Sequence, residues 1–308
     1  MYDDDHRLVG AATRPEPIGL MLDRSRSSCI FTVAALMCVA CRGAAPGAAS
    51  PIAPPADAST AVHETLTVQS SALNESRLIN VHLPVAYRDE STTSPRRFPV
   101  LYMPDGGMDE DFPHVVHAVD SLTAAGVIRP VIVVGVPNTE RRRDLTGPTR
   151  VASDSAIAAH VGGSAAFRRF FKGELIPAIE SRYRTTPERA IIGESLAGLF
   201  IVETFLRDPL LFDHYVAFDP SLWWNRGGLI DSAATLLSTA PRSANRRSLY
   251  VAASRDDIGG QSARLTRVLL PNAPAGLWWT VEGAREDVTH ATIFHALEVT
   301  GLVNALRW

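Results

Sequence analysis

Apolar residues along the chain fall into two kinds of short run. The segments 62–70 and 76–83 alternate apolar and polar positions, as expected for an antiparallel pair of strands with one face in water. Later runs, such as VIVVGV at 131–136 and RAIIG at 189–193, are continuously apolar, which is typical of strands covered on both faces. Altogether the pattern predicts eight strands, at 62–70, 76–83, 98–103, 131–136, 189–193, 214–218, 248–254 and 276–282.

Helical spacing of apolar residues fills the gaps between the later strands. Strands that alternate with helices form βαβ units, which bring successive strands into parallel pairing and pack helices on the sheet. No internal repeat is visible in the sequence. Residues 62–308 are therefore predicted to form one α/β domain on a mostly parallel sheet, with helices at 110–125, 164–182, 196–207, 260–270 and 290–306.

The residues before 62 have a different character. Arg24 and Arg26 precede a 13-residue apolar run from Cys29 to Cys41, which is the pattern of a secretory signal and is too short to span a bilayer. An Ala- and Pro-rich stretch without periodicity follows, and such a stretch cannot pack a core. We interpret the chain as a mis-called upstream extension, a signal peptide, a linker and the folded domain, at residues 1–20, 21–41, 42–61 and 62–308.

The three cysteines all lie within the predicted signal, at positions 29, 38 and 41. The folded domain therefore has neither a disulfide framework nor a Cys-ligated metal. A lipid on Cys41 is an alternative to plain cleavage near Ala44 or Ala49, and it is the one membrane attachment we expect. Both alternatives predict an exported protein, either periplasmic or secreted.

Charge indicates no charged macromolecular partner. The chain has 30 Lys and Arg residues against 33 Asp and Glu residues, for a net charge of −3. The densest basic run, Arg141 to Arg143, is of the size found on ordinary surfaces, so we expect no binding to nucleic acid.

The segment RAIIGESLAGLF at 189–200 is the strongest chemical signal in the sequence. It predicts a strand, a sharp turn and a helix, with Ser195 at the turn. A nucleophilic serine occupies such a turn, and the small residues Gly193, Ala197 and Gly198 leave the backbone room to bend. The alternative is a serine that only caps the helix.

A nucleophilic serine needs a histidine base, which follows it in chain order in this kind of fold. Of the three later histidines, His214 opens a predicted strand and His295 lies well inside a predicted helix, so both are expected to pack. His290 lies in the loop between the last strand and the last helix. We therefore predict that His290 is the base.

The acid that orients His290 is expected at the carboxyl end of a central strand. Asp257 and Asp256 follow the strand at 248–254 and are the favoured candidates, although a loop aspartate can equally cap the next helix. Asp219, after the strand at 214–218, is the runner-up, and a Ser–His dyad is a further alternative.

Acyl transfer also requires two N–H donors for an oxyanion. The N–H of Leu196 is one candidate, and Gly106 and Gly107 in YMPDGGM offer the second unless they only form a turn.

Candidate substrate-binding residues are Trp223, Trp224 and Arg141, each of which could instead serve packing or the surface. His114 and His117 have no carboxylate motif at zinc-site spacing, so we expect helix-face residues there, no metal and no cofactor.

Seen together, these segments resemble the putative esterase family of α/β hydrolases, the group that contains esterase D and the enterochelin-type siderophore esterases. The resemblance covers most of 62–308, from the P-x-x-Y turn at Pro84 and Tyr87 onwards. It rests on FPVLYMPDGG, VIVVGVPNTERRRDLTGP, FFKGELIPAIESRYRT, RAIIGESLAGLF, LFDHYVAFDPSLWWN and THATIFHALEVTGL.

This resemblance implies an α/β-hydrolase fold, a central mostly parallel eight-stranded sheet with helices on both faces. It also implies Ser195 as nucleophile, His290 as base and an acid near Asp256 or Asp257, where relatives often carry Glu. Two departures concern the acid. Asp219 stands where relatives usually have Ser, and Asp287 to Thr289 replace a shorter E-N-H before the histidine.

The function these features favour is hydrolysis of a small-molecule carboxylic ester through an acyl-enzyme on Ser195. Relatives that move acyl groups share this site, so acyl transfer to an alcohol is an alternative. A catalytically inactive binding module is the alternative from another class, and the joint presence of Ser195, His290 and the glycines argues against it.

Overall fold

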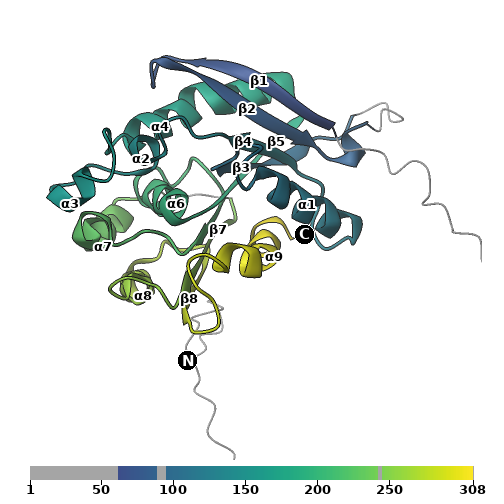
Figure 1. Ribbon diagram of the computed structural model, residues 1–308. Coiled ribbons are helices and arrows are strands. Elements are labelled where there is room, and N and C mark those ends of the chain that lie inside the picture. The colour runs from purple at the N-terminus through teal and green to yellow at the C-terminus, as the bar shows by residue number, and fades with distance from the viewer. Residues whose placement is uncertain (1–61, 89–94, 242–244, 308) are drawn as a thin grey trace, which may run out of the picture. The chain divides into compact units, whose positions relative to one another are not determined.

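A computed structural model describes residues 62–88, 95–241 and 245–307 (Figure 1). The predicted upstream extension, signal peptide and linker lie outside these ranges. Within the described part of the chain, no helix is long and apolar enough to cross a bilayer.

One eight-stranded sheet forms the centre of the domain, in the order β1-β2-β4-β3-β5-β6-β7-β8. The pair β1–β2 and the pair β2–β4 are antiparallel, and every other neighbouring pair is parallel. The predicted mostly parallel eight-stranded sheet is thus confirmed. Its strands are β1 (Val62–Ser70), β2 (Glu75–Leu83), β3 (Phe98–Pro104), β4 (Ile132–Val136), β5 (Thr185–Glu194), β6 (His214–Phe218), β7 (Arg247–Ser254) and β8 (Leu277–Arg285).

Helices connect the parallel strands. The predicted helix at 164–182 is present as three consecutive helical segments with a π-helical turn in the middle. Four other helical segments were not predicted: the 3-10 helix η1 and the α-helices α2, α3 and α7. The helical segments are η1 (Val85–Arg88), α1 (Phe112–Ala124), α2 (Arg141–Leu145), α3 (Ala152–Ser155), α4 (Ser164–Phe170), η2 (Phe171–Leu175), α5 (Ile176–Arg182), α6 (Ser195–Arg207), α7 (Trp224–Ser238), α8 (Gln261–Asn272) and α9 (Ile293–Leu306).

Both faces of the sheet are buried, which explains the continuous apolar runs in its central strands. On one face α1 and α9 pack together (Figure 1). Phe294 of α9 packs there against Phe218 of β6, with the ring centroids 5.3 Å apart. On the other face α4, η2 and α6 supply an aromatic core that includes Phe167, Phe171 and Phe200. The helices on both faces confirm the predicted α/β-hydrolase architecture.

A buried ion pair fixes the loop that follows β4. Arg77 on β2 and Asp144 on α2 are both about 1% exposed, and Nη1 of Arg77 lies 2.6 Å from Oδ2 of Asp144. Arg143 donates to the other carboxylate oxygen at 2.7 Å. Because a buried charge is costly unless it is paired, this carboxylate holds the R-x-x-D block against the sheet.

The fold brings the carboxyl ends of the parallel strands β3, β5, β6 and β7 to one edge. Sites in open α/β sheets form at this edge, because loops from neighbouring strands meet there. Asp105, Ser195 and Asp219 directly follow β3, β5 and β6, and Ser254 is the last residue of β7, so all four lie at this edge.

Candidate active site

Ser195 lies at the turn between β5 and α6, where the sequence placed it. Its φ is +59°, a left-handed conformation that is rare for a residue other than glycine or asparagine. A Cβ at Gly193 would lie 2.7 Å from Cβ of Ala197, and one at Gly198 would lie 3.0 Å from Cα of Pro220. The small residues are thus required for α6 to turn back so closely against the sheet.

The imidazole of His290 lies between a serine hydroxyl and a carboxylate. Its Nε2 is 3.1 Å from Oγ of Ser195, and its Nδ1 is 2.6 Å from Oδ2 of Asp219. His290 lies in the loop between β8 and α9, and Asp219 directly follows β6. The three side chains therefore form one continuous chain of contacts from hydroxyl to carboxylate, as nucleophilic catalysis by serine requires.

Asp219 is held in place by the carboxyl end of the neighbouring strand β7. It is 7% exposed, and its own N–H donates to the carbonyl of Ala252 at 2.7 Å. Its carboxylate accepts hydrogen bonds from the N–H of Ser254 at 3.0 Å and from the Oγ of Ser254 at 2.8 Å. Ser254 is fully buried, so Asp219 has one orientation toward His290.

The structure corrects the predicted acid. Asp257 does not reach the imidazole, because its carboxylate accepts hydrogen bonds from the first two N–H groups of α8, at 3.0 and 3.1 Å. Asp256 accepts the main-chain N–H of His290 at 2.8 Å and so supports the loop rather than the ring. The runner-up, Asp219, is the carboxylate at the imidazole.

The electrostatics of this arrangement suit a general base. The hydrogen bond to Asp219 raises the pKa of His290 above its ordinary value, against the opposing effect of burial. Burial alone would raise the pKa of Asp219, but hydrogen bonds from His290 and Ser254 outweigh it and hold that pKa below its ordinary value. Asp219 is therefore ionised when His290 accepts a proton, and it stabilises the imidazolium.

Two further residues touch this site without having been predicted. Glu194 precedes the serine, and burial raises its pKa to about 7, with no hydrogen-bond partner for its Oε1 among the described residues. The Oγ of Ser221 lies 3.4 Å from the Oγ of Ser195, and the N–H of Ser221 donates to the Ser195 carbonyl. Nothing in the local sequence distinguishes Ser221, in a loop, or Ser254, at the end of β7, from an ordinary serine, since both act through contacts with residues distant in the chain.

The predicted oxyanion donors differ in whether their N–H group already has a hydrogen-bond partner. Leu196 is in the first turn of α6, where N–H groups have no partner within the helix. The prediction that Gly106 is an oxyanion donor is wrong, because its N–H already donates to the carbonyl of Val136 at 3.1 Å. A Cβ there would lie 2.4 Å from the backbone of Gly135, so this glycine serves close packing.

Gly107 remains a candidate donor. Its N–H donates to a carboxylate oxygen of Glu110 at 2.7 Å, and that side chain is only partly buried. An oxyanion could therefore replace the carboxylate if Glu110 turns away. The oxyanion role of Gly107 and Leu196 stays a prediction.

The predicted substrate-binding residues, Trp223, Trp224 and Arg141, differ in how far they are buried. Trp224 is 3% exposed and its Nε1 donates to the carbonyl of Gly147 at 2.8 Å, so it is a core residue and that prediction is wrong. Trp223 is half-buried beside it. Arg141 makes a two-pronged ion pair with Asp105, at 2.8 and 2.7 Å, and more than a third of its side chain is exposed. Substrate contact by Trp223 and Arg141 remains a prediction.

The sheet order, the strained serine at the β5–α6 turn and the Ser195–His290–Asp219 chain define an α/β-hydrolase fold with a serine-hydrolase type of site. The sequence model of the putative esterase family matches residues 70–288, and the chain belongs to this family. Membership was the prediction made from the motifs, and it is confirmed.

Particular relatives agree with this placement. The chain is 30% identical to the ferri-bacillibactin esterase BesA of Bacillus subtilis over 51% of this chain and 58% of the relative. It is 29% identical to a siderophore triacetylfusarinine C esterase of Aspergillus fumigatus, over 54% and 58% of the two chains. The chain thus spans about three fifths of the length of these curated relatives.

Solved structures show the same fold. An IroE-like serine hydrolase from Shewanella oneidensis matches with a TM-score of 0.67 and 26% identity, over 79% of each chain. The siderophore hydrolase EstB from Aspergillus nidulans matches with a TM-score of 0.66 and 22% identity, over 82% of this chain and 98% of that one.

Proposed function

We propose that this protein is a carboxylic-ester hydrolase that works through an acyl-enzyme on Ser195. The observation that carries the proposal is the contact chain from Oγ of Ser195 to Nε2 of His290 at 3.1 Å, and from Nδ1 of His290 to Asp219 at 2.6 Å. Family membership and the two siderophore esterases among the relatives support it.

The chemistry follows from these contacts. The Oγ of Ser195 attacks the ester carbonyl while His290 takes its proton, and Asp219 stabilises the imidazolium. The N–H groups of Leu196 and Gly107 stabilise the oxyanion, and His290 then protonates the departing alcohol. A water, activated by neutral His290, next attacks the acyl-enzyme and releases the acid and Ser195.

We propose an ester of the siderophore class as the substrate, because the two curated relatives named above are a ferri-bacillibactin esterase and a siderophore triacetylfusarinine C esterase. Arg141 near this edge of the sheet is paired with Asp105 but partly exposed, and it is the basic residue that we expect to meet an anionic, metal-chelating acyl group.

The proposal is tested with p-nitrophenyl esters of increasing chain length and a trilactone siderophore. We expect turnover by the wild type and a loss of roughly 10⁶-fold in kcat for Ser195→Ala. Ser238→Ala, which alters an exposed serine at the end of α7, is the matched control and keeps full activity. Equal turnover by wild type and Ser195→Ala would defeat the proposal.

We also propose that the protein is exported through the signal at 21–41, with Cys41 as the alternative lipid site. The basic residues followed by a 13-residue apolar run support this. Expression of the full reading frame, followed by cell fractionation and an intact mass of the mature chain, tests it. A mature chain that retains residues 21–41 in the cytoplasm would contradict it.

A further inference from the structure

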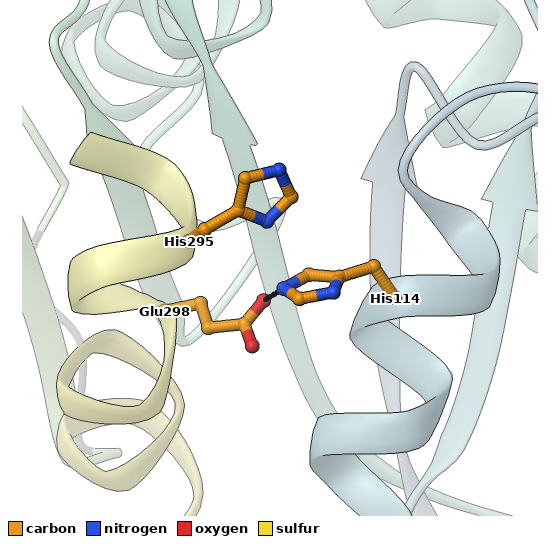
Figure 2. A group of neighbouring side chains, drawn as sticks. All are labelled: His114, His295 and Glu298. Atoms are coloured by element: carbon orange, nitrogen blue, oxygen red, sulfur yellow. Dashed lines mark ion pairs between the residues drawn. The ribbon is translucent and has the colours of Figure 1, made fainter. Parts of the chain in front are cut away.

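Two helices on one face of the sheet bring together two histidines and a glutamate outside the active site. His114 lies in the first turn of α1, and His295 and Glu298 lie on α9, three residues apart and so on the same side of the helix. Their ligand atoms all lie within 4.8 Å of one another. Figure 2 shows His114 facing α9, with one ring nitrogen of His295 directed toward the His114–Glu298 pair.

His114 of α1 and Glu298 of α9 lie close together, but their facing polar atoms lack hydrogen bonds. The Nε2 of His114 and the Oε2 of Glu298 are both buried and lie 2.7 Å apart, so they form an ion pair when His114 is protonated, but the geometry between them is not that of a hydrogen bond. No other described residue provides a hydrogen bond to either atom. Buried polar atoms left in this way are costly, and a cation between them would satisfy both.

Among the described residues, the only cationic partner of Glu298 is His114, and only while that imidazole is protonated. Glu298 is 5% exposed, and within the described ranges no Lys or Arg pairs with it. The half-buried Asp111 at the start of α1 adds further negative charge near His114. A local excess of negative charge around a buried carboxylate attracts a cation.

We propose that His114, His295 and Glu298 bind a transition-metal dication of the Zn²⁺ type. Two imidazole nitrogens and one carboxylate oxygen are ligands that suit Zn²⁺, whereas Ca²⁺ and Mg²⁺ prefer oxygen alone. Tetrahedral Zn²⁺ places its ligand atoms about 3.3 Å apart, so metal binding requires a small rotation of the partly exposed His114 that widens its 2.7 Å contact with Glu298, and a small rotation of the exposed His295 toward both. Water completes the coordination on the exposed side.

The metal would link α1 to α9, and each of these helices directly follows a segment that contributes to the active site. The segment that precedes α1 contains Gly107, and the segment that precedes α9 contains His290. A bound dication therefore fixes the two loops that supply an oxyanion donor and the general base, and it stabilises the folded chain because it binds only when the two helices are packed.

Calorimetric titration of the chelator-treated full chain with ZnCl₂ alone tests this site, with Cys29, Cys38 and Cys41 changed to serine so that no thiol binds the metal. We expect about one Zn²⁺ per chain and a Tm raised by roughly 5 °C or more in excess metal. His295→Ala removes an exposed ligand and Glu298→Gln keeps the shape of a buried one, and each is expected to weaken binding by about tenfold or more.

Two controls separate this site from other histidines. His117→Ala alters an exposed histidine one turn along α1 and leaves the affinity unchanged. His290→Gln removes the catalytic imidazole and also leaves it unchanged. No binding at micromolar Zn²⁺, binding that persists in both His295→Ala and Glu298→Gln, or binding that His290→Gln abolishes would overturn the proposal.

Discussion

Replacing Asp219 with asparagine separates the acid found in the structure from the acids favoured by the sequence. The carboxylate accepts hydrogen bonds on both oxygens, from the N–H and Oγ of Ser254 and from Nδ1 of His290. If the asparagine oxygen keeps the bond from the Ser254 N–H, its NH₂ group faces Nδ1. The imidazole must then carry its proton on Nε2, where it can no longer accept the proton of Ser195.

The size of the effect follows from this change of tautomer. An aspartate-to-asparagine change that enforces the wrong tautomer costs about 10⁴-fold in kcat, which corresponds to about 5.4 kcal/mol of transition-state stabilisation. The pH profile should move as well. Since neutral His290 is the base, activity falls as the pH drops through its pKa, and Asp219 raises that pKa. In the variant, the ascending limb shifts toward the ordinary value of about 6.5.

The assay is hydrolysis of a short-chain p-nitrophenyl ester across a pH series, with kcat and kcat/KM measured for each variant. Asp257→Asn is the matched control, because asparagine also caps a helix and α8 should keep its start. We expect the control to stay within a few-fold of the wild type. A crippled Asp257→Asn beside an active Asp219→Asn would refute the reasoning.

Three other variants extend the account. Glu194→Gln removes a carboxyl group whose ionised form raises the pKa of His290, so the ascending limb of the kcat/KM profile should move to lower pH, and an unmoved limb would count against this electrostatic coupling. Gly106→Ala puts a methyl group 2.4 Å from the backbone of Gly135 and should lower stability by about 1–3 kcal/mol, measured by thermal melting, whereas Gly173→Ala, with open space around it, should not. Asp144→Asn removes the buried one of the two carboxylates that pair with Arg77, the other being Glu75, and should cost about 3–5 kcal/mol in urea unfolding, whereas Asp231→Asn, in an exposed ion pair, should cost less than about 1 kcal/mol. Equal losses in that last pair would contradict the role given to the buried pair.

The strands and the nucleophile could be predicted because their signals are local. A buried parallel strand must be apolar throughout, so β4 and β6 are visible as VIVVGV and HYVAF runs. The turn at Ser195 needs small neighbours at fixed offsets, and those offsets are readable in the sequence.

The acid could not be fixed in the same way. The ends of β6 and β7 are neighbours in the sheet, so a carboxylate after either strand starts within reach of the histidine loop. The choice depends on which carboxylate is taken by another partner. The carboxylate of Asp257 accepts hydrogen bonds from the N–H groups of α8, and the hydrogen bond from Ser254 orients Asp219 toward the imidazole. Contacts between distant loops decide this, and they leave no periodic signal.

The helix α7 was not predicted, and Trp224 was predicted to bind substrate rather than to lie in the core, for a related reason. Asn225, Arg226 and Gly227 have left-handed backbone angles, so the apolar spacing of the helix begins only after a kink. The same kinked segment places Trp224 in the core. A pair of tryptophans at the carboxyl edge of a sheet therefore favoured a binding role that the structure gives to at most one of them.

Covalent labelling of Ser195 tests the central claim most directly. The protein is treated with a p-nitrophenyl dialkyl phosphate, which phosphorylates an activated serine, and its intact mass and peptides are then measured. We predict one added phosphoryl group per chain, located on Ser195 and lost in Ser195→Ala and in His290→Gln. A chain that takes up no label, or takes it up equally in Ser195→Ala, would contradict the account.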